Sequence, residues 1–124
     1  MFKVMICALL FGASAAAYAQ PAILTVELSN FKFSPNAIQL RRGTPTTLHL
    51  HNSAGGAHNF SAPEFFAAAR FVGASARLVR NGTIEVPGHG AVDVTLVPSA
   101  GKYRLKCTHT FHSTFGMKGT IAVN

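Results

Sequence analysis

Acidic residues are scarce in this sequence, and tryptophan is absent. Four Asp and Glu residues stand against eleven Lys and Arg, which gives a formal net charge of +7 at pH 7 with neutral histidines. This excess of positive charge favours acidic or anionic partners. The basic residues do not cluster, so we expect no nucleic-acid partner, and a solvated basic surface without a partner stays open as the plain alternative.

Long hydrophobic runs are missing after the first nineteen residues. Residues 1–19, MFKVMICALLFGASAAAYA, combine Lys3 with an apolar stretch and a final Ala-Tyr-Ala, the pattern of a secretory signal peptide. No later run approaches the roughly 20 apolar residues that a membrane-spanning helix needs. We therefore expect an exported, periplasmic monomer without stable membrane insertion, with a single domain over residues 20–124.

Cysteine is almost lacking as well. Of the two cysteines, Cys7 lies in the expected leader, so only Cys107 remains and no intramolecular disulfide can form. A single thiol in an oxidising compartment is a liability unless it is buried or ligated, which favours a metal site or a catalytic role.

The remaining sequence is dominated by short segments with apolar residues at every second position. Such alternation between Gly, Pro and Asn boundaries predicts seven or so strands, and so an all-β Greek-key sandwich or barrel. The pairs that mark these strands are Val26 and Leu28, Ile38 and Leu40, Leu48 and Leu50, Ile84 and Val86, Val94 and Leu96, Leu105 and Cys107, and Ile121 and Val123.

One segment departs from the alternation. Residues 61–79, SAPEFFAAARFVGASARLV, are rich in alanine, and Ser61 stands three residues before Glu64 as in a capping box. This pattern predicts one short helical insert at about residues 63–73. It indicates no function for the insert.

Possible metal ligands are concentrated in CTHTFHSTFGM, residues 107–117. Cys107 alternates with Tyr103 and Leu105, so its side chain should face the core. A loop of this kind can wrap Cys107, His112 and Met117 around one ion. Because thiolate and thioether donors are soft and imidazole is intermediate, the set favours copper over calcium, magnesium or manganese.

A fourth donor has to come from elsewhere in the chain, and His58 in SAGGAHNFSAP is the strongest candidate. It follows a Gly-Gly turn that can lie at the same end of a sandwich as the loop after Cys107. One Cys, two His and one distant Met form the ligand set of blue copper electron-transfer sites.

These motifs resemble the cupredoxin family, which includes plastocyanin, azurin and rusticyanin. Residues 31–52, FKFSPNAIQLRRGTPTTLHLHN, are similar to the early strands of the family, and HNF at residues 58–60 resembles its first-ligand motif. YRLKC and the spacing Cys-x4-His-x4-Met resemble its ligand loop. The resemblance covers nearly the whole expected mature sequence and implies a cupredoxin-like sandwich with one type 1 copper ion.

The resemblance also implies a role for each site residue. The equatorial ligands would be His58, Cys107 and His112, the axial ligand would be Met117, and Asn59 and Thr108 would tie the two ligand loops together. By the same resemblance the protein is no enzyme and transfers single electrons between Cu(II) and Cu(I) states. The excess of positive charge favours a redox partner that presents an acidic docking surface. The alternative is a periplasmic copper carrier or resistance protein that binds and delivers the ion.

Other histidines leave further possibilities open. His109 lies two residues after Cys107, where relatives usually have a residue that is not a ligand, and it competes with His112 for the role of ligand. His49 and His51 alternate with leucines and should face outward. A second metal site built from His49, His51 or His109 remains an alternative, as does a Cys107–His112 nucleophile pair.

The sequence is rich in phenylalanine, with ten Phe residues in all. We expect most of them to lie in the core. Phe111 and Phe115 flank the expected ligand loop, where an apolar collar would exclude water and offer a docking patch to a redox partner.

Overall fold

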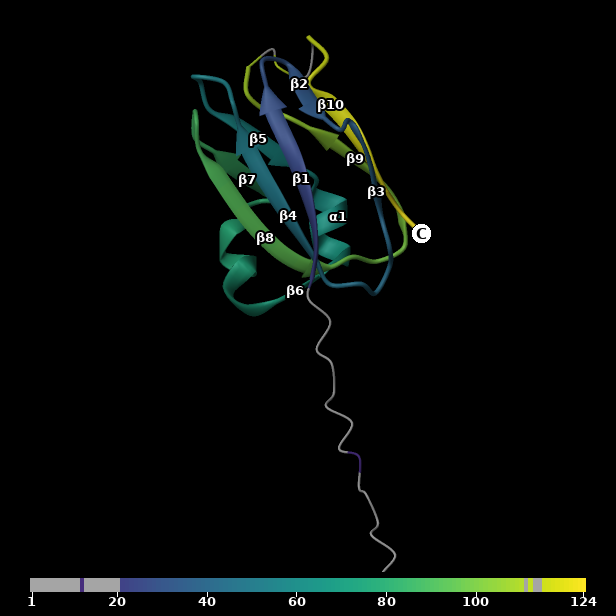
Figure 1. The fold of residues 1–124 in the computed structure, drawn as a ribbon. Coiled ribbons are helices and arrows are strands. Elements are labelled where there is room, and N and C mark those ends of the chain that lie inside the picture. The colour runs from purple at the N-terminus through teal and green to yellow at the C-terminus, as the bar shows by residue number, and fades with distance from the viewer. Residues whose placement is uncertain (1–11, 13–20, 111, 113–114) are drawn as a thin grey trace, which may run out of the picture.

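The computed structural model describes residue 12, residues 21–110, residue 112 and residues 115–124. Two five-stranded sheets pack face to face, which confirms the expected all-β sandwich (Figure 1). The expected leader lies outside the described residues apart from Gly12. Among the described residues, no helix has the length and apolar character needed to cross a membrane.

The first sheet has the strand order β2-β1-β4-β8-β6. Its strands are β1 (Ala22–Ser29), β2 (Lys32–Ser34), β4 (Thr46–Asn52), β6 (Arg70–Phe71) and β8 (Ala91–Val97). β1 runs parallel to β4, whereas the other neighbours are antiparallel.

The second sheet has the order β3-β10-β9-β5-β7. Its strands are β3 (Ala37–Leu40), β5 (His58–Ser61), β7 (Thr83–Val86), β9 (Gly101–Lys106) and β10 (Lys118–Val123). β9 is antiparallel to both β10 and β5, so the loop that joins β9 to β10 lies beside the start of β5.

The core fills the space between the two sheets. In β4, alternate residues are buried and the residues between them are half-buried, because successive side chains of a strand point to opposite faces. The same period holds in β3, β8 and β10. Residues with the largest fully buried side chains include Leu28, Phe33, Leu48, Phe60, Ile84, Leu96, Leu105 and Ile121.

Alternation predicted the longer strands and missed three short ones. β2 and β6 have only three and two residues, too few to establish a period. β5 was missed for another reason, since all four of its residues are buried. A continuous buried stretch shows no alternation, although β5 carries His58 and Asn59.

The helical insert begins as predicted but ends earlier. The helix α1 spans Pro63–Ala68, after which the chain becomes extended at Ala69 and pairs with β8 through β6. A 3-10 helix follows over Gly73–Leu78. The predicted capping box is wrong: the N-cap is Ala62, without a side-chain hydrogen bond, and Ser61 belongs to β5.

Candidate metal centre

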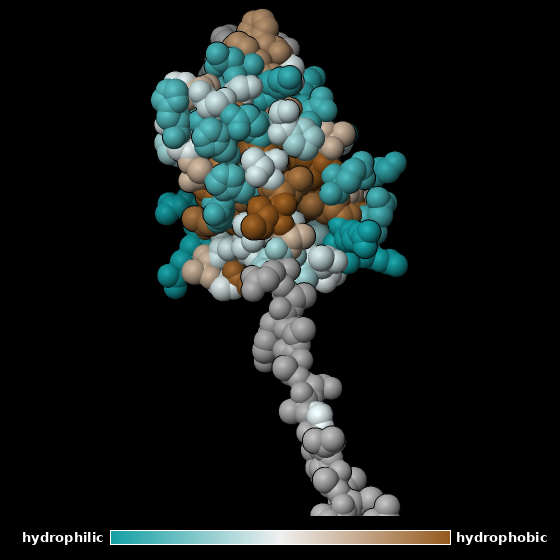
Figure 2. Space-filling view, viewed as in Figure 1, coloured by the Kyte–Doolittle hydropathy of each residue, from teal (hydrophilic) through white to brown (hydrophobic). Residues whose placement is uncertain are grey.

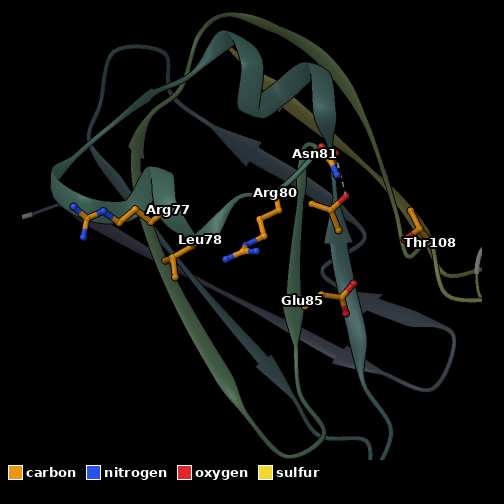
Figure 3. Close-up of a pocket in the computed structure, with 7 residues that line it drawn as sticks. Arg77, Leu78, Arg80, Asn81, Glu85 and Thr108 are labelled. Carbon is orange, nitrogen blue, oxygen red and sulfur yellow. Dashed lines mark hydrogen bonds between the residues drawn. The ribbon is translucent and has the colours of Figure 1, made fainter.

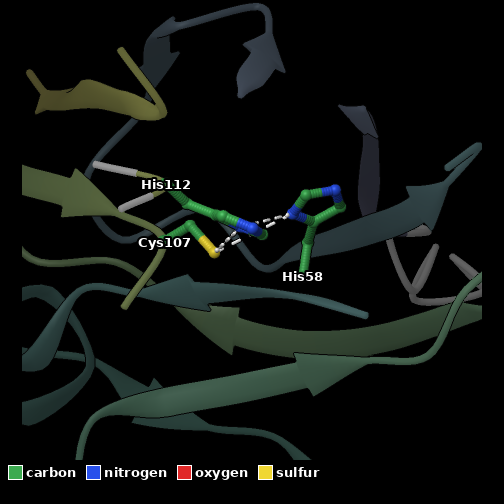
Figure 4. A group of neighbouring side chains, drawn as sticks. All are labelled: His58, Cys107 and His112. Carbon is green, nitrogen blue, oxygen red and sulfur yellow. Dashed lines mark hydrogen bonds between the residues drawn. The ribbon is translucent and has the colours of Figure 1, made fainter. Parts of the chain in front are cut away.

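Three potential metal donors meet at one end of the sandwich. His58 is the first residue of β5, Cys107 follows the last residue of β9, and His112 lies in the loop before β10. Figure 4 shows the three side chains pointing toward one another. Among the described residues, they form the one group of three or more His, Cys, Asp or Glu side chains whose donor atoms converge, all within 4.8 Å.

The three donor atoms form a compact triangle. His58 Nδ1 lies 3.0 Å from His112 Nδ1, and Cys107 Sγ lies 3.3 Å from His112 Nδ1 and 3.9 Å from His58 Nδ1. Bonds of about 2.0 Å to nitrogen and about 2.3 Å to sulfur, as zinc makes with such donors, place two ligands of one ion roughly 3 to 4 Å apart. The triangle therefore has the size of a metal site, and its thiolate and imidazole donors fit type 1 copper.

Burial leaves the His58 ring ready to bind a cation. Burial, followed by electrostatic repulsion from the His112 and His109 rings, lowers the pKa of His58, which favours the neutral ring that a metal ion requires. His58 Nε2 is buried without a hydrogen-bond partner in the described part of the chain. Such an orphaned polar atom is costly in a folded protein. The nitrogen of His58 that faces Cys107 and His112 is the other one, Nδ1.

The thiol of Cys107 is a poor candidate nucleophile. Cys107 is fully buried, although His112 Nδ1 lies within reach of its sulfur. A catalytic thiol needs an accessible, activated sulfur. The geometry favours a bound ion over the Cys107–His112 nucleophile pair.

Main-chain hydrogen bonds hold Met117 beside the donors. The Cys107 N–H donates to Met117 O at 3.0 Å, and the Met117 N–H donates to His112 O at 2.9 Å. The Met117 side chain is fully buried in the core. Its role as axial ligand remains a prediction.

Asn59 connects the strand of His58 to the segment that follows Cys107. Its Nδ2–H donates to Thr108 Oγ1 at 2.7 Å, and the Thr108 N–H donates to Asn59 Oδ1 at 2.8 Å. The Asn59 main-chain N–H also points at Cys107 Sγ, 3.5 Å away. These contacts have the form that the resemblance implied for Asn59 and Thr108.

His109 lies beside the donors without joining them. Its Nε2–H donates to Glu85 Oε2 at 2.9 Å, and its ring stacks on that of His112 with centroids 5.5 Å apart. Sequence reasoning did not identify Glu85 as a site residue. Its place in the strand indicated an outward side chain, but no pattern revealed that β7 would bring Glu85 opposite Asn59.

The apolar surface near His112 includes Phe31, which was not among the residues expected to flank the ligand loop. Most phenylalanines were expected in the core, but Phe31 is 42% exposed, has a positive φ of 58° and packs its ring edge-on against His112, with centroids 5.2 Å apart. Phe115 contacts Phe31 at 5.4 Å, while Phe111 lies outside the described residues. Figure 2 shows a largely polar face with apolar groups across its middle and at its upper tip, where Figure 1 places the loop between β9 and β10.

The remaining predicted histidines lie on the outer face of the first sheet. His49 and His51 alternate with buried leucines, as expected, and their Nδ1 atoms bond to Asp93 and Glu27, respectively. Their rings are parallel, with centroids 6.5 Å apart. In the described chain, they are not part of any converging group of three or more donors, so the geometry does not favour a second metal site there.

Comparison with known proteins supplies a family and a set of similar folds. The model of the family described as "Cupredoxin-like domain" matches residues 2–123. No protein of curated function matches the chain by sequence.

Several solved structures share the fold. A dithionite-reduced auracyanin from Roseiflexus castenholzii has a TM-score of 0.60 at 18% identity, covering 86% of this chain and 99% of that one. Auracyanin A, a blue copper protein from Chloroflexus aurantiacus, has a TM-score of 0.55 at 22% identity, with coverage of 83% and 100%. The multicopper oxidase McoA from Aquifex aeolicus has a TM-score of 0.59 at 15% identity, and the match spans 84% of this chain but 29% of the oxidase.

Proposed function

The chain belongs to the cupredoxin-like domain family, and we propose from this premise that it is a blue copper protein that passes single electrons between redox partners. The observation that carries this proposal is the convergence of His58 Nδ1, Cys107 Sγ and His112 Nδ1. When bound, copper supplies the one-electron couple between Cu(II) and Cu(I). The protein itself transforms no substrate.

The sandwich holds the donors in nearly fixed positions. His58 lies in a buried strand, and Cys107 directly follows the neighbouring strand. Donors held in this way rearrange little between two oxidation states, which favours rapid electron transfer. The Asn59 N–H lies against the sulfur, where a hydrogen bond tunes the donor strength of a thiolate. Met117 is the proposed axial ligand.

His112 is the proposed route for the electron. It is half-buried, whereas His58 and Cys107 are buried, so it connects the centre to the surface. Phe31 packs against its ring and Phe115 packs against Phe31. These apolar rings shield the donors from water and leave an edge on which a partner can dock.

An absorption spectrum tests the proposed centre. Addition of Cu(II) to the purified protein should produce an intense visible band from thiolate-to-copper charge transfer, and Cys107→Ser and His112→Ala should abolish it. His89→Ala, at a histidine outside the donor group, serves as the matched control and should keep the band. A wild-type protein that binds copper without this band would overturn the proposal.

We propose that the partner presents an acidic surface. In the described chain, every side-chain ion pair joins a carboxylate to a histidine: Glu27 to His51, Glu85 to His109 and Asp93 to His49. The Lys and Arg side chains of this part are therefore left without a carboxylate partner. They remain available to an acidic protein, which would be steered by complementary charge.

An open pocket of about 510 Å³ places some of these positively charged side chains close to the metal centre. Arg77 and Arg80 line it, together with Thr108 and Glu85 from the network around Asn59. Figure 3 shows Arg80 between Leu78 and Glu85, with Thr108 at the far side. The pocket supports docking of acidic side chains next to the donors.

A second candidate function is copper delivery by an exported copper carrier or resistance protein. The half-exposed His109 favours it, because its ring stacks on His112 and an imidazole beside a copper site can receive or pass on the ion. His49 and His51 are further exposed imidazoles on the outer face of the first sheet. Transfer of Cu(I) to an apo-acceptor, with slow electron exchange, would support the carrier. A reversible one-electron couple with fast exchange would support electron transfer.

Export to the periplasm is proposed from the leader pattern of residues 1–19. The chain should be processed to begin near residue 20 when it is produced in a bacterial host. Mass spectrometry of the protein released from the periplasm checks this, and an unprocessed cytoplasmic product would contradict it.

A further inference from the structure

The ring of His109 is placed against that of His112, although His109 is not one of the three converging donors. The two ring centroids are 5.5 Å apart and the planes differ by 28°. The His112 N–H also donates to His109 O at 3.0 Å. His109 thus contacts His112 through both its side chain and its main chain.

Glu85 connects His109 to the body of the protein. It lies in β7, directly opposite Asn59 in β5. Its Oε1 accepts a hydrogen bond from Asn59 Nδ2–H at 2.8 Å, and its Oε2 accepts one from His109 Nε2–H at 2.9 Å. One carboxylate therefore joins the rigid sheet on one side to the ligand loop on the other.

The chemistry of this pair determines which nitrogen of His109 carries hydrogen. Partial burial opposes ionisation of Glu85, but hydrogen bonds from Asn59 and His109 outweigh it, so the pKa of Glu85 lies below its usual value. An ionised carboxylate only accepts, so His109 Nε2 must donate. This nitrogen is then unable to bind copper, which agrees with the position of His109 outside the donor triangle.

We propose that Glu85 and His109 form a brace that positions His112 at the metal centre. The inference rests on the proposed function, because it assigns the brace to a ligand of the proposed copper site. The sheet holds Glu85, Glu85 holds the imidazole of His109, and the face of that imidazole limits the rotation of the His112 ring. Both residues are positioning residues and neither binds the ion.

Together with Phe31, whose ring packs edge-on against His112, the brace explains why a half-buried histidine on a loop can keep its donor atom in register with two buried donors. Within the described residues, the second main-chain hydrogen bond of His112 is at its carbonyl, which accepts from the Met117 N–H. That bond leaves the imidazole free to rotate. Residues that orient metal ligands typically change metal affinity or activity by about 10- to 100-fold when they are removed.

Four variants and a matched control test the brace. Glu85→Ala removes the anchor. Glu85→Gln keeps an oxygen that accepts from Asn59 and an NH2 group that can donate to His109 Nε2 once the His109 proton moves to Nδ1. His109→Ala removes the ring, while His109→Phe keeps a ring face but loses the bond to Glu85. Glu27→Ala is the control, because Glu27 accepts from His51 at the same distance of 2.9 Å on another sheet.

The first measurement uses copper-loaded protein. We expect the reduced forms of Glu85→Ala and His109→Ala to release Cu(I) to a chelator about tenfold faster than wild type. The oxidised forms should show a changed Cu(II) EPR line shape. Glu85→Gln should stay near wild type, and His109→Phe should lie between wild type and His109→Ala. Glu27→Ala should leave both the release rate and the spectrum unchanged.

The second measurement uses protein without metal, by amide hydrogen exchange. The amides of His112 and Met117 should exchange about tenfold faster in Glu85→Ala, the change expected for loss of the one hydrogen bond that ties the ligand loop, through His109, to the charged carboxylate. Amides in β4 should keep their wild-type rates, which separates local release of the loop from general destabilisation. Should Glu85→Ala fail to fold, His109→Phe tests the same link with the carboxylate in place.

The outcomes distinguish the brace from the proposed function. A wild-type protein without a blue band contradicts the copper function, while hydrogen exchange still tests the brace. Wild-type release and exchange rates in both Glu85→Ala and His109→Ala would overturn the brace and leave the function intact. Equal effects in Glu27→Ala would also overturn it, since they would reflect net charge alone.

Discussion

Asn59 and Thr108 exchange two hydrogen bonds directly beside the candidate metal centre, at 2.7 and 2.8 Å. Asn59 follows the first donor histidine in β5, and Thr108 follows Cys107 after β9. The pair therefore locks together the two segments that carry His58 and Cys107. The stability of the protein and the geometry of its site depend on the same contacts.

Replacement of Asn59 by alanine should destabilise the protein even without metal. The change leaves the Thr108 N–H without its acceptor and removes two donated hydrogen bonds, one of them to the ionised Glu85. We expect the free energy of unfolding to fall by about 1–3 kcal/mol. Urea denaturation of the apo-protein measures it. Asn30→Ala, at an exposed turn residue, should stay near wild type, and equal losses in both variants would contradict the assignment.

Stability of the apo-protein should decrease as the pH falls below neutrality. Burial lowers the pKa of His58 below its usual value of 6.5, so below pH 6.5 the unfolded chain takes up a proton that the folded chain resists. The unfolded state then binds more protons, and acidification favours unfolding. Denaturation midpoints between pH 8 and pH 5 test this. A pH-independent midpoint in wild type, or an unchanged slope in His58→Gln, would contradict it.

Glu85 should add a second, more acidic step. Its pKa lies below the usual 4.5, so its contribution to stability is present above pH 4.5 and is lost as the pH falls through the folded-state pKa. Comparison of wild type with Glu85→Gln between pH 5 and pH 3 measures this step. We expect the steeper loss of stability in wild type, and parallel curves would show that Glu85 does not contribute.

Gly119 should not tolerate a side chain. It lies in β10, and a Cβ there would be 2.3 Å from the carbonyl oxygen of Asn36. Because this neighbour is main chain, the clash can be relieved only by shifting strands, and we expect Gly119→Ala to destabilise by about 1–3 kcal/mol. Thermal unfolding measures the loss. Gly56→Ala, where no atom lies within 4 Å of the added carbon, is the control and should unfold near the wild-type temperature.

The sequence carried most of the information on the fold. Alternation predicted the longer strands because one face of each packs on the core while the other meets solvent. It also placed Cys107 inward, as found. The short strands were not predicted, because two or three residues define no period and β5 is buried throughout. The early end of α1 was not predicted either, because the helix ends where the chain turns to pair β6 with β8, and this pairing is a tertiary contact.

The same holds for the site: the residues marked by local sequence patterns were predicted, and those placed by tertiary contacts were not. His58, Cys107 and His112 followed from donor chemistry and spacing, and the tie between Asn59 and Thr108 followed from the family resemblance. Glu85 and Phe31 were missed because their contacts join segments far apart in sequence. Composition showed that acidic residues are scarce, but it could not show that three of the four pair with histidines.

Charge reversal in the pocket lined by Arg77 and Arg80 should slow electron transfer from the reduced protein to anionic oxidants. We expect the double variant Arg77→Glu with Arg80→Glu to lower the rate at which ferricyanide oxidises the reduced protein by about tenfold at low ionic strength. High salt should reduce the difference, because it screens exposed charges. Stopped-flow absorbance at the blue band measures both rates, with cationic tris(phenanthroline)cobalt(III) as the opposite probe.

A control with the same change in net charge separates docking at the pocket from a general field. Arg41 and Arg42 are exposed in the turn between β3 and β4, and they do not line the pocket. Reversal of both charges there should slow ferricyanide oxidation much less than reversal at Arg77 and Arg80, because steering depends on charge close to the site of transfer. Equal slowing by the two double variants would show that net charge alone attracts the anion, and the pocket would lose its proposed role.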